Sequence, residues 1–293
     1  MSDFDTFILG QVCLDVNTDY GCEPVREPGG AVLYSGFAAA AMGYRVAVLH
    51  KGNRQTIDPF SAFSGQPSIA VHALESAQST SIRNVYLTPD RERRESWVDS
   101  RIDPYLPEEV PEVDAAIYHL AGLMRGDLGH GMIRLAAQRS MAALDVQSIL
   151  RVVKNGRMAF EDWPEKTQYL QMIRFLKADA HEAKILTGLD SLEEAARVLH
   201  GWGAGEVMIT HNTRVIAFDG GRVHSQPLKP RSLRGRTGRG DTCFSGYITQ
   251  RLEKGVPEAL RMAAALVSLK METPGPFRGS REEVEDYANR FFG

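Results

Sequence analysis

Residues 236–252, RTGRGDTCFSGYITQRL, have the residue types and spacing expected of a phosphate-binding site. Gly238 and Gly240 flank Arg239, and Asp241 follows at once. Apolar residues then recur at helical spacing, so a glycine-rich turn should lead into a helix. Glycines let backbone N–H groups approach an anion closely, and a helix N-terminus carries partial positive charge. A carboxylate beside bound phosphate could accept a proton from an attacking hydroxyl group.

A structural reading of the same segment remains open, because aspartate is a favoured N-cap residue and a turn before a helix needs no function. The other common phosphate motifs do not compete. The sequence contains neither GxxxxGK[ST] nor a strand-linked GxGxxG.

The composition is that of an ordinary globular protein of one large or two small domains, with 43% hydrophobic and 24% charged residues among 293. A net charge of −3 favours neither nucleic acid nor an anionic membrane. The three cysteines are unclustered and offer no metal-ligand spacing. The N-terminus shows no signal-peptide pattern and no apolar run is long enough to span a bilayer, so we expect a cytoplasmic protein.

Short apolar runs alternate with helical patterns along most of the chain. The expected strands are Phe4–Gly10, Arg45–Lys51, Ala115–Gly122, Met141–Val146, Arg174–Asp179 and Glu206–Thr210. The expected helices are Ala31–Met42, Leu128–Arg139, Lys166–Ile173, Ala180–Thr187, Leu192–Trp202, Thr242–Lys254, Pro257–Glu272 and Glu282–Phe292. This alternation predicts an α/β fold with a largely parallel sheet and crossover helices.

Two polar segments interrupt the alternation. Residues 11–28 are rich in turn formers, and residues 81–99 contain two strand-like runs, SIRNVYL and RRESWVD, separated by TPDRE. A hairpin this polar does not suit a sheet core, so we expect parts of 11–28 and 81–101 to form a small β lid. An ordinary surface hairpin would explain the pattern equally well. Paired edge strands of such a lid would give a homodimer.

Four segments follow one another in an order and spacing typical of one enzyme family. They are GGAVLYSGFAAAAMGYRVAVLHKGN, KADAHEAKILTG, TGRGDTCFSGYI and AAALVSLKMETPGP. They resemble, in turn, the first signature, the Asn-x-x-Glu stretch, the second signature and the adenine-side helix of the ribokinase-like (PfkB) carbohydrate kinases. The resemblance covers nearly the whole chain and implies a single ribokinase-like domain over residues 1–293. That fold has three layers, with a largely parallel central sheet between helices.

The resemblance also implies roles for individual residues. Asp241 would be the catalytic base, and the amides of Gly238, Arg239 and Gly240 would neutralise charge on the transferred phosphoryl group. The residues expected to bind substrate are Asp15, Gly29, Gly30 and Tyr34. The residues expected to bind the nucleotide are Thr210, Asn212, Ser268 and Gly275. The residues expected to hold Mg²⁺, through water, are Glu182 and Asp179.

Several positions depart from the family pattern. Gly235 and Arg236 replace an Asp-Thr pair whose aspartate belongs to a monovalent-cation site in many relatives. We therefore expect little potassium activation, with Arg236 and Arg239 supplying the positive field instead. Asp179 replaces the usual asparagine, and Tyr34 stands where sugar-specific relatives often carry a substrate-binding asparagine.

The segments GGAVLYSG, ALDVQSILR, KADAHEAKILTG and TGRGDTC resemble a short-lid branch that includes myo-inositol kinases and some nucleoside kinases. In that branch Asp145 and Gln147, just after a strand, would lie near the site. The implied activity is ATP- and Mg²⁺-dependent phosphorylation of a hydroxyl group on a small polyol or sugar.

Two alternatives stay open. A nucleoside kinase of the same fold would be favoured by an aromatic residue facing the site, such as Tyr34 or Trp97. A non-catalytic nucleotide- or sugar-binding relative is disfavoured by the intact Asp241, because a binding module needs no base. The basic residues between Lys229 and Arg239 adjoin the phosphate loop, so attraction of ATP or plain solvation explains them better than nucleic acid.

Overall fold

The core of the protein is a nine-stranded sheet, seen in a computed structural model that describes residues 2–88 and 93–292. The strand order is β15-β14-β13-β12-β9-β8-β1-β4-β5, and all neighbours from β13 to β5 are parallel. The six predicted strands are all present, as β1 (Phe4–Leu9), β4 (Val46–Gly52), β8 (Ala115–Leu120), β9 (Met141–Asp145), β12 (Phe175–Asp179) and β13 (Glu206–Thr210). Three further strands were not predicted: β5 (Ile69–Glu75), β14 (Arg214–Phe218) and β15 (Val223–Pro227).

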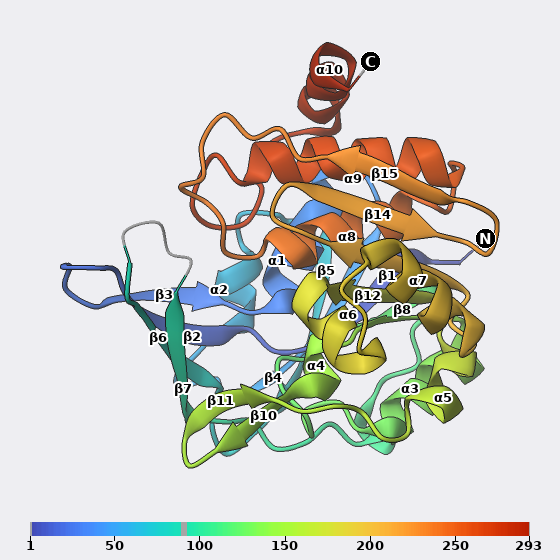
Figure 1. Ribbon diagram of the computed structural model, residues 1–293. Helices are drawn as coiled ribbons and strands as arrows, with labels where there is room; N and C mark the ends of the chain where they lie inside the picture. The colour runs from blue at the N-terminus through green and yellow to red at the C-terminus, as the bar shows by residue number, and fades with distance from the viewer. Residues whose placement is uncertain (1, 89–92, 293) are drawn as a thin grey trace.

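Helices cover both faces of this sheet (Figure 1). One face packs against α1 (Ala31–Ala41), α8 (Arg239–Gln250) and α9 (Val256–Lys270), with α10 (Arg281–Phe291) against α9. The other packs against α3 (His130–Arg139), α6 (Ala180–Thr187) and α7 (Leu192–Gly201). The expectation of a three-layer α/β fold is confirmed. No helix of the described chain is long and apolar enough to cross a membrane.

Several predicted helix limits were wrong by one to four residues, and one helix is broken. The stretch predicted as Lys166–Ile173 is α5 (Lys166–Tyr169) followed by a 3₁₀ turn, Leu170–Met172. The tighter 3₁₀ geometry is common where a helix ends. Short helices that were not predicted are α2 (Pro59–Phe63), α4 (Gln147–Leu150) and the 3₁₀ turn Pro107–Glu109.

A second sheet of six strands projects from the carboxyl edge of the first, at the left of Figure 1. Its order is β10-β11-β7-β6-β2-β3. Its strands are β2 (Cys13–Thr18), β3 (Val25–Gly29), β6 (Ser81–Tyr86), β7 (Arg94–Ser100), β10 (Arg151–Lys154) and β11 (Arg157–Phe160). The two segments predicted for a β lid thus share one sheet, although part of the predicted turn TPDRE, residues 89–92, lies outside the described residues.

The hairpin formed by β10 and β11 was missed in the sequence. Its turn is Asn155-Gly156, and both residues have left-handed backbone angles, with φ of 51° and 77°. Asn-Gly between two strand-like runs is the strongest short-range hairpin signal, because this pair readily adopts the required positive φ angles. The hairpin joins the second sheet where Arg157 pairs with Trp97 of β7.

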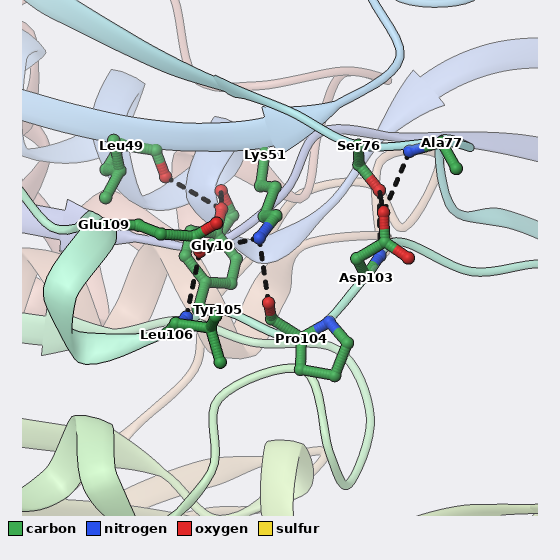
Figure 2. A network of polar contacts seen from close by, with 10 residues as sticks. All are labelled: Gly10, Leu49, Lys51, Ser76, Ala77, Asp103, Pro104, Tyr105, Leu106 and Glu109. Atoms are coloured by element: carbon green, nitrogen blue, oxygen red, sulfur yellow. Dashed lines mark hydrogen bonds and ion pairs between the residues drawn. The ribbon is translucent and has the colours of Figure 1, made fainter.

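The chain that returns from β7 to the core is fixed to the nine-stranded sheet (Figure 2). The buried Lys51 ammonium of β4 donates to Pro104 O at 2.8 Å and to Glu109 Oε2 at 2.7 Å. The Tyr105 hydroxyl donates to Gly10 O at 2.8 Å, at the end of β1. The base of the second sheet is therefore held by buried polar contacts, which are costly to break.

Candidate active site

A cavity of about 700 Å³ lies between the carboxyl edge of the nine-stranded sheet and the inner face of the second sheet. Ligands commonly bind at this edge in open α/β sheets. Five cationic side chains line the cavity, namely Arg94, Arg151, Lys177, Arg236 and Arg239. Three carboxylates line it as well, namely Asp15, Asp179 and Asp241. A cavity with this surplus of positive charge suits a polyanionic ligand.

The glycine turn and Asp241 form one wall of the cavity. Helix α8 begins at Arg239, three residues earlier than predicted, because Gly238 caps it in the left-handed conformation with φ of 74°. Asp241 therefore lies in the first helical turn, and its role is not that of an N-cap. A Cβ on Gly238 would lie 2.2 Å from the Tyr34 ring, so only glycine fits there.

The first-turn amides of α8 come before its regular helical hydrogen bonds. Thr242 N donates the first regular helical bond, to Gly238 O at 3.0 Å, and the amides of Gly240 and Asp241 precede it. The first N–H groups of a helix have no intrahelical acceptor. Of the three amides predicted for the anion hole, that of Arg239 donates to Arg236 O at 3.2 Å. The role of the three predicted amides in an anion hole stays a prediction.

The Asp241 carboxyl group has the electrostatic properties of a general base. Burial and the nearby Asp145 carboxylate raise the pKa of Asp241 to about 6, against the opposing charges of Lys177 and Arg151. A base with a pKa near the working pH is the most effective proton acceptor. Ser35 Oγ donates to Asp241 O at 3.4 Å, which ties this turn of α8 to α1.

Lys177 is a buried cation near the glycine turn. It was not predicted from the sequence as a site residue. Its Nζ lies 2.9 Å from Asp145 Oδ2 and 3.5 Å from Glu182 Oε2. Burial would lower the pKa of Lys177, but these carboxylates more than offset it and the net pKa is raised. A Cβ on Gly240 would lie 3.2 Å from Lys177 Nζ. The ammonium therefore lies directly beside the glycine turn.

The two predicted metal ligands occupy different environments. Asp179 and Glu182 form a capping box at the start of α6, with bonds of 2.8 and 2.7 Å between side chains and amides. Asp179 lines the cavity. Glu182 is 1% exposed and lies 3.5 Å from Lys177 Nζ, so the two carboxylates have different surroundings, and their role as metal ligands stays a prediction. Burial raises the pKa of Glu182.

The second sheet and the start of α1 form the opposite wall. Asp15 is buried, and its Oδ1 accepts a bond from Cys13 Sγ at 3.0 Å. Burial raises the pKa of Asp15. A Cβ on Gly29 would meet Asp15 Oδ2 at 2.4 Å, and Gly30 has φ of 105°. Asp15 and Gly30 line the cavity as predicted, and Gly29 supports Asp15 from behind.

Several residues of this wall were not singled out from the sequence. They are Asn84, Tyr86, Arg94, Arg151, Met158 and Phe160. The β10–β11 hairpin contributes Arg151 and Phe160, and the Phe160 ring meets the His181 ring edge-on at 5.3 Å. The Asn-Gly turn was the available signal for this hairpin. Gln147, expected near the site, lines the cavity. Asp145, also expected there, forms an ion pair with Lys177, which lines the cavity.

Comparison with known proteins agrees with this geometry. The family model described as pfkB family carbohydrate kinase matches residues 71–282. The chain belongs to the pfkB family of carbohydrate kinases. As a member of that family it is a phosphotransferase that acts on an alcohol group.

Three solved or curated relatives give this assignment more detail. A pyrophosphate-dependent kinase of the ribokinase family is 31% identical, with a TM-score of 0.88 over 96% of this chain and 99% of its own. A pyrophosphate-dependent myo-inositol-1 kinase, converted into a myo-inositol-3 kinase by two mutations, is 28% identical, with a TM-score of 0.87 over 98% and 100%. Cytidine kinase of Thermococcus kodakarensis is 23% identical over 83% of this chain and 87% of its own.

The residues that the pfkB resemblance assigned to a nucleotide do not form one surface. Thr210, which pairs with Asp179 in the sheet, lines the cavity, but Asn212, Ser268 and Gly275 do not. Asn212 Oδ1 accepts a bond from Arg239 Nη1 at 2.9 Å. Ser268 is fully buried: its Oγ donates to Ala264 O and accepts from Lys229 N. The Ser268 hydroxyl is therefore paired within the fold, and its contact with a nucleotide stays a prediction.

Proposed function

We propose that this pfkB kinase transfers a phosphoryl group from inorganic pyrophosphate to a hydroxyl group of a small polyol such as myo-inositol. The observation that carries the proposal is the composition of the cavity. Its phosphate end has the anion-binding turn and the charges of Lys177, Arg236 and Arg239, while the predicted adenine-side residues Ser268 and Gly275 lie outside it. The two pyrophosphate-dependent relatives support the same donor.

The acceptor end offers polar groups that suit a polyol. Asp15 and Gln147 supply a carboxylate and an amide to the lining, and Asn84, whose amide also bonds to Asn17 and Ser96, lies beside them. Of the two aromatic residues expected to stack on a base, Tyr34 lines the cavity beside Gly238. Trp97 does not line it, and its ring packs against the guanidinium groups of Arg83 and Arg157.

The chemistry follows from the placement of Asp241. The acceptor hydroxyl oxygen attacks the nearer phosphorus in line, and its proton passes to the Asp241 carboxylate. The bond between that phosphorus and the bridging oxygen breaks, releasing orthophosphate and leaving a phosphate monoester. Lys177 and the amides of the turn stabilise the negative charge on the transferred group, which is the largest contribution in phosphoryl transfer.

The fit of a divalent ion can be judged from the carboxylates present. Among residues 2–88 and 93–292, no group of three or more potential ligands forms a metal site. Mg²⁺ usually keeps several waters and binds through one or two carboxylates plus phosphate oxygens. Asp179 is placed to supply that carboxylate, so the residues fit a water-bridged Mg²⁺ that would neutralise donor charge.

A nucleoside acceptor is the second candidate. Tyr86 and Phe160 line the cavity, so an aromatic surface exists on which a base could stack. The cytidine kinase relative is consistent with this possibility. The homodimer expected through a lid edge stays a prediction, with β3 and β10 as the edge strands that would pair.

Product analysis by ³¹P NMR tests the proposal. The purified protein, with Mg²⁺, receives pyrophosphate or ATP together with myo-inositol, ribose or cytidine. We expect a phosphate monoester and orthophosphate from pyrophosphate and myo-inositol. If only the reactions that contain ATP turn over, the donor assignment is overturned. If only the reactions that contain cytidine turn over, the acceptor assignment is overturned.

A further inference from the structure

Lys270, the last residue of α9, lies beneath the phosphate loop and is fully buried. Its Nζ donates to Gly235 O at 2.6 Å and to Thr237 O. The same Nζ lies 4.9 Å from the centre of the Tyr34 ring, within cation–π distance. Gly235 and Thr237 lie within the three residues before the N-cap Gly238, so this ammonium holds carbonyl groups of the loop that leads into α8.

No carboxylate of the described residues forms an ion pair with Lys270, which is unusual for a buried cation. Burial lowers the pKa of Lys270 to about 8, while the Asp241 carboxylate opposes this fall. Lys270 is thus an ammonium at neutral pH. Its charge is stabilised by hydrogen bonds to two carbonyl oxygens and by a cation–π contact with an aromatic ring. Carbonyl oxygens converging on one charge are also the ligands that bind monovalent cations in proteins.

The position of Gly235 argues further against a free ion here. A Cβ on Gly235 would lie 1.9 Å from Thr273 O and 2.8 Å from Lys270 O. Gly235 N also donates to Met271 O at 2.8 Å. The loop is therefore pressed against the end of α9, and the aspartate that many relatives place here for a monovalent cation could not be accommodated without moving that backbone.

We propose that Lys270 is a built-in cation that replaces a free monovalent ion and holds the phosphate loop in its anion-binding conformation. The proposal differs from the expectation that Arg236 and Arg239 supply that field. Both arginines line the cavity, where Arg239 bonds to Asn212, whereas Lys270 lies behind the loop. Lys270 is a positioning residue. The inference rests on the proposed function only in its kinetic test, because that test needs turnover.

The kinetic test exchanges cations at constant ionic strength. Wild-type turnover should change by less than about twofold between K⁺ and tetramethylammonium, a difference equivalent to about 0.4 kcal/mol. Lys270→Ala should lower kcat about tenfold to a hundredfold, as is usual for groups that orient a site's ligands. Ammonium or K⁺ should restore a large part of that loss. Lys254→Ala, an exposed lysine after α8, is the matched control and should show no cation response.

Hydrogen exchange gives a readout that needs no substrate. Amides of residues 235–241 should exchange equally in K⁺ and tetramethylammonium in the wild type, and should regain protection with K⁺ only in Lys270→Ala. Lys270→Met keeps more of the packing and replaces the alanine variant if that one unfolds. Strong K⁺ dependence of the wild type, in turnover or in exchange, would overturn the proposal. So would a folded Lys270 variant that needs no added cation. A wild type without turnover but with cation-independent exchange would overturn the proposed function alone.

Discussion

The two ends of the cavity are built in different ways. The phosphate end consists of backbone and buried charges on the nine-stranded sheet and its helices, where Lys177 and Lys270 are both buried and hydrogen-bonded or paired to other groups. The acceptor end consists largely of side chains from the second sheet, whose strands β2 and β6 alternate between buried and half-exposed residues. Preorganised charge accelerates chemistry, whereas adjustable side chains select a substrate. Substitutions at the phosphate end should therefore lower kcat, and those at the acceptor end should raise KM.

The largest expected effect is that of Asp241→Asn. The amide keeps the shape of the side chain but cannot accept the proton, so kcat should fall roughly 10²- to 10⁴-fold. Pyrophosphate binding, measured by calorimetry, should stay near the wild-type value, and thermal unfolding checks the fold. Near-normal turnover in a folded variant would remove Asp241 from the mechanism.

Lys177→Met should come next, with kcat lowered roughly 10²- to 10³-fold, because a charge beside the transferred phosphoryl group is lost. The KM for the polyol should change little. The matched control is Lys184→Met. Lys184 lies one helical turn after the start of α6, is exposed and pairs with Asp190. If the Lys177→Met variant lost only polyol affinity, Lys177 would act at the acceptor end of the cavity, which would contradict its assignment to the phosphate end.

At the acceptor end, Asp15→Asn should raise the KM for the polyol about tenfold to a hundredfold, the usual loss when a charged hydrogen-bond acceptor becomes neutral. The kcat at saturation should stay within a few-fold of wild type. Asp99→Asn is the control on the same sheet, because Asp99 pairs with Arg83 and does not line the cavity. A fall in kcat with unchanged KM would contradict the separation of roles.

The pH profile should show one acid limb. The base must be deprotonated to accept the proton, and the pKa of Asp241 is raised to about 6, so kcat/KM is retained above that pH and lost below it. Between pH 7 and pH 5 we expect a fall of about tenfold. The residual activity of Asp241→Asn should lack this limb. A flat profile over this range would indicate another base.

The smallest expected effect is that of Trp97→Leu. Trp97 lies between Arg83 and Arg157 and does not line the cavity, so the ratio of kcat/KM for cytidine and myo-inositol should change less than about twofold. Tyr86→Leu, on the cavity wall, is the comparison variant and should change that ratio more. The opposite ranking would mean that Trp97 contacts the acceptor.

The same contrast explains what the sequence could predict. Strands buried on both faces and the glycine turn before Asp241 are local patterns, and they were located correctly. Lys177 was missed because a lysine inside a buried strand acquires its role only from Asp145 on the neighbouring strand, a contact 32 positions away. The β10–β11 hairpin carried its Asn-Gly signal, yet its place beside Trp97 depends on pairing between distant segments.

The donor side shows what a linear motif leaves undetermined. The segment around Ser268 resembles the adenine-side helix of relatives, but a linear motif does not reveal how the side chains beside that helix are packed. Here the Ser268 hydroxyl donates to Ala264 O and accepts from Lys229 N. Likewise, the sequence shows Gly235 in place of a carboxylate, but not that Lys270, 35 residues further along the chain, donates to the Gly235 carbonyl.

Donor competition tests the central claim most directly. Wild-type protein receives equimolar pyrophosphate and ATP with myo-inositol and Mg²⁺, and the initial release of orthophosphate and ADP is followed by ³¹P NMR. We predict that pyrophosphate is consumed at least about tenfold faster, a preference equivalent to about 1.4 kcal/mol. Faster release of ADP, with pyrophosphate left intact, would contradict a cavity that binds its donor through phosphate groups alone.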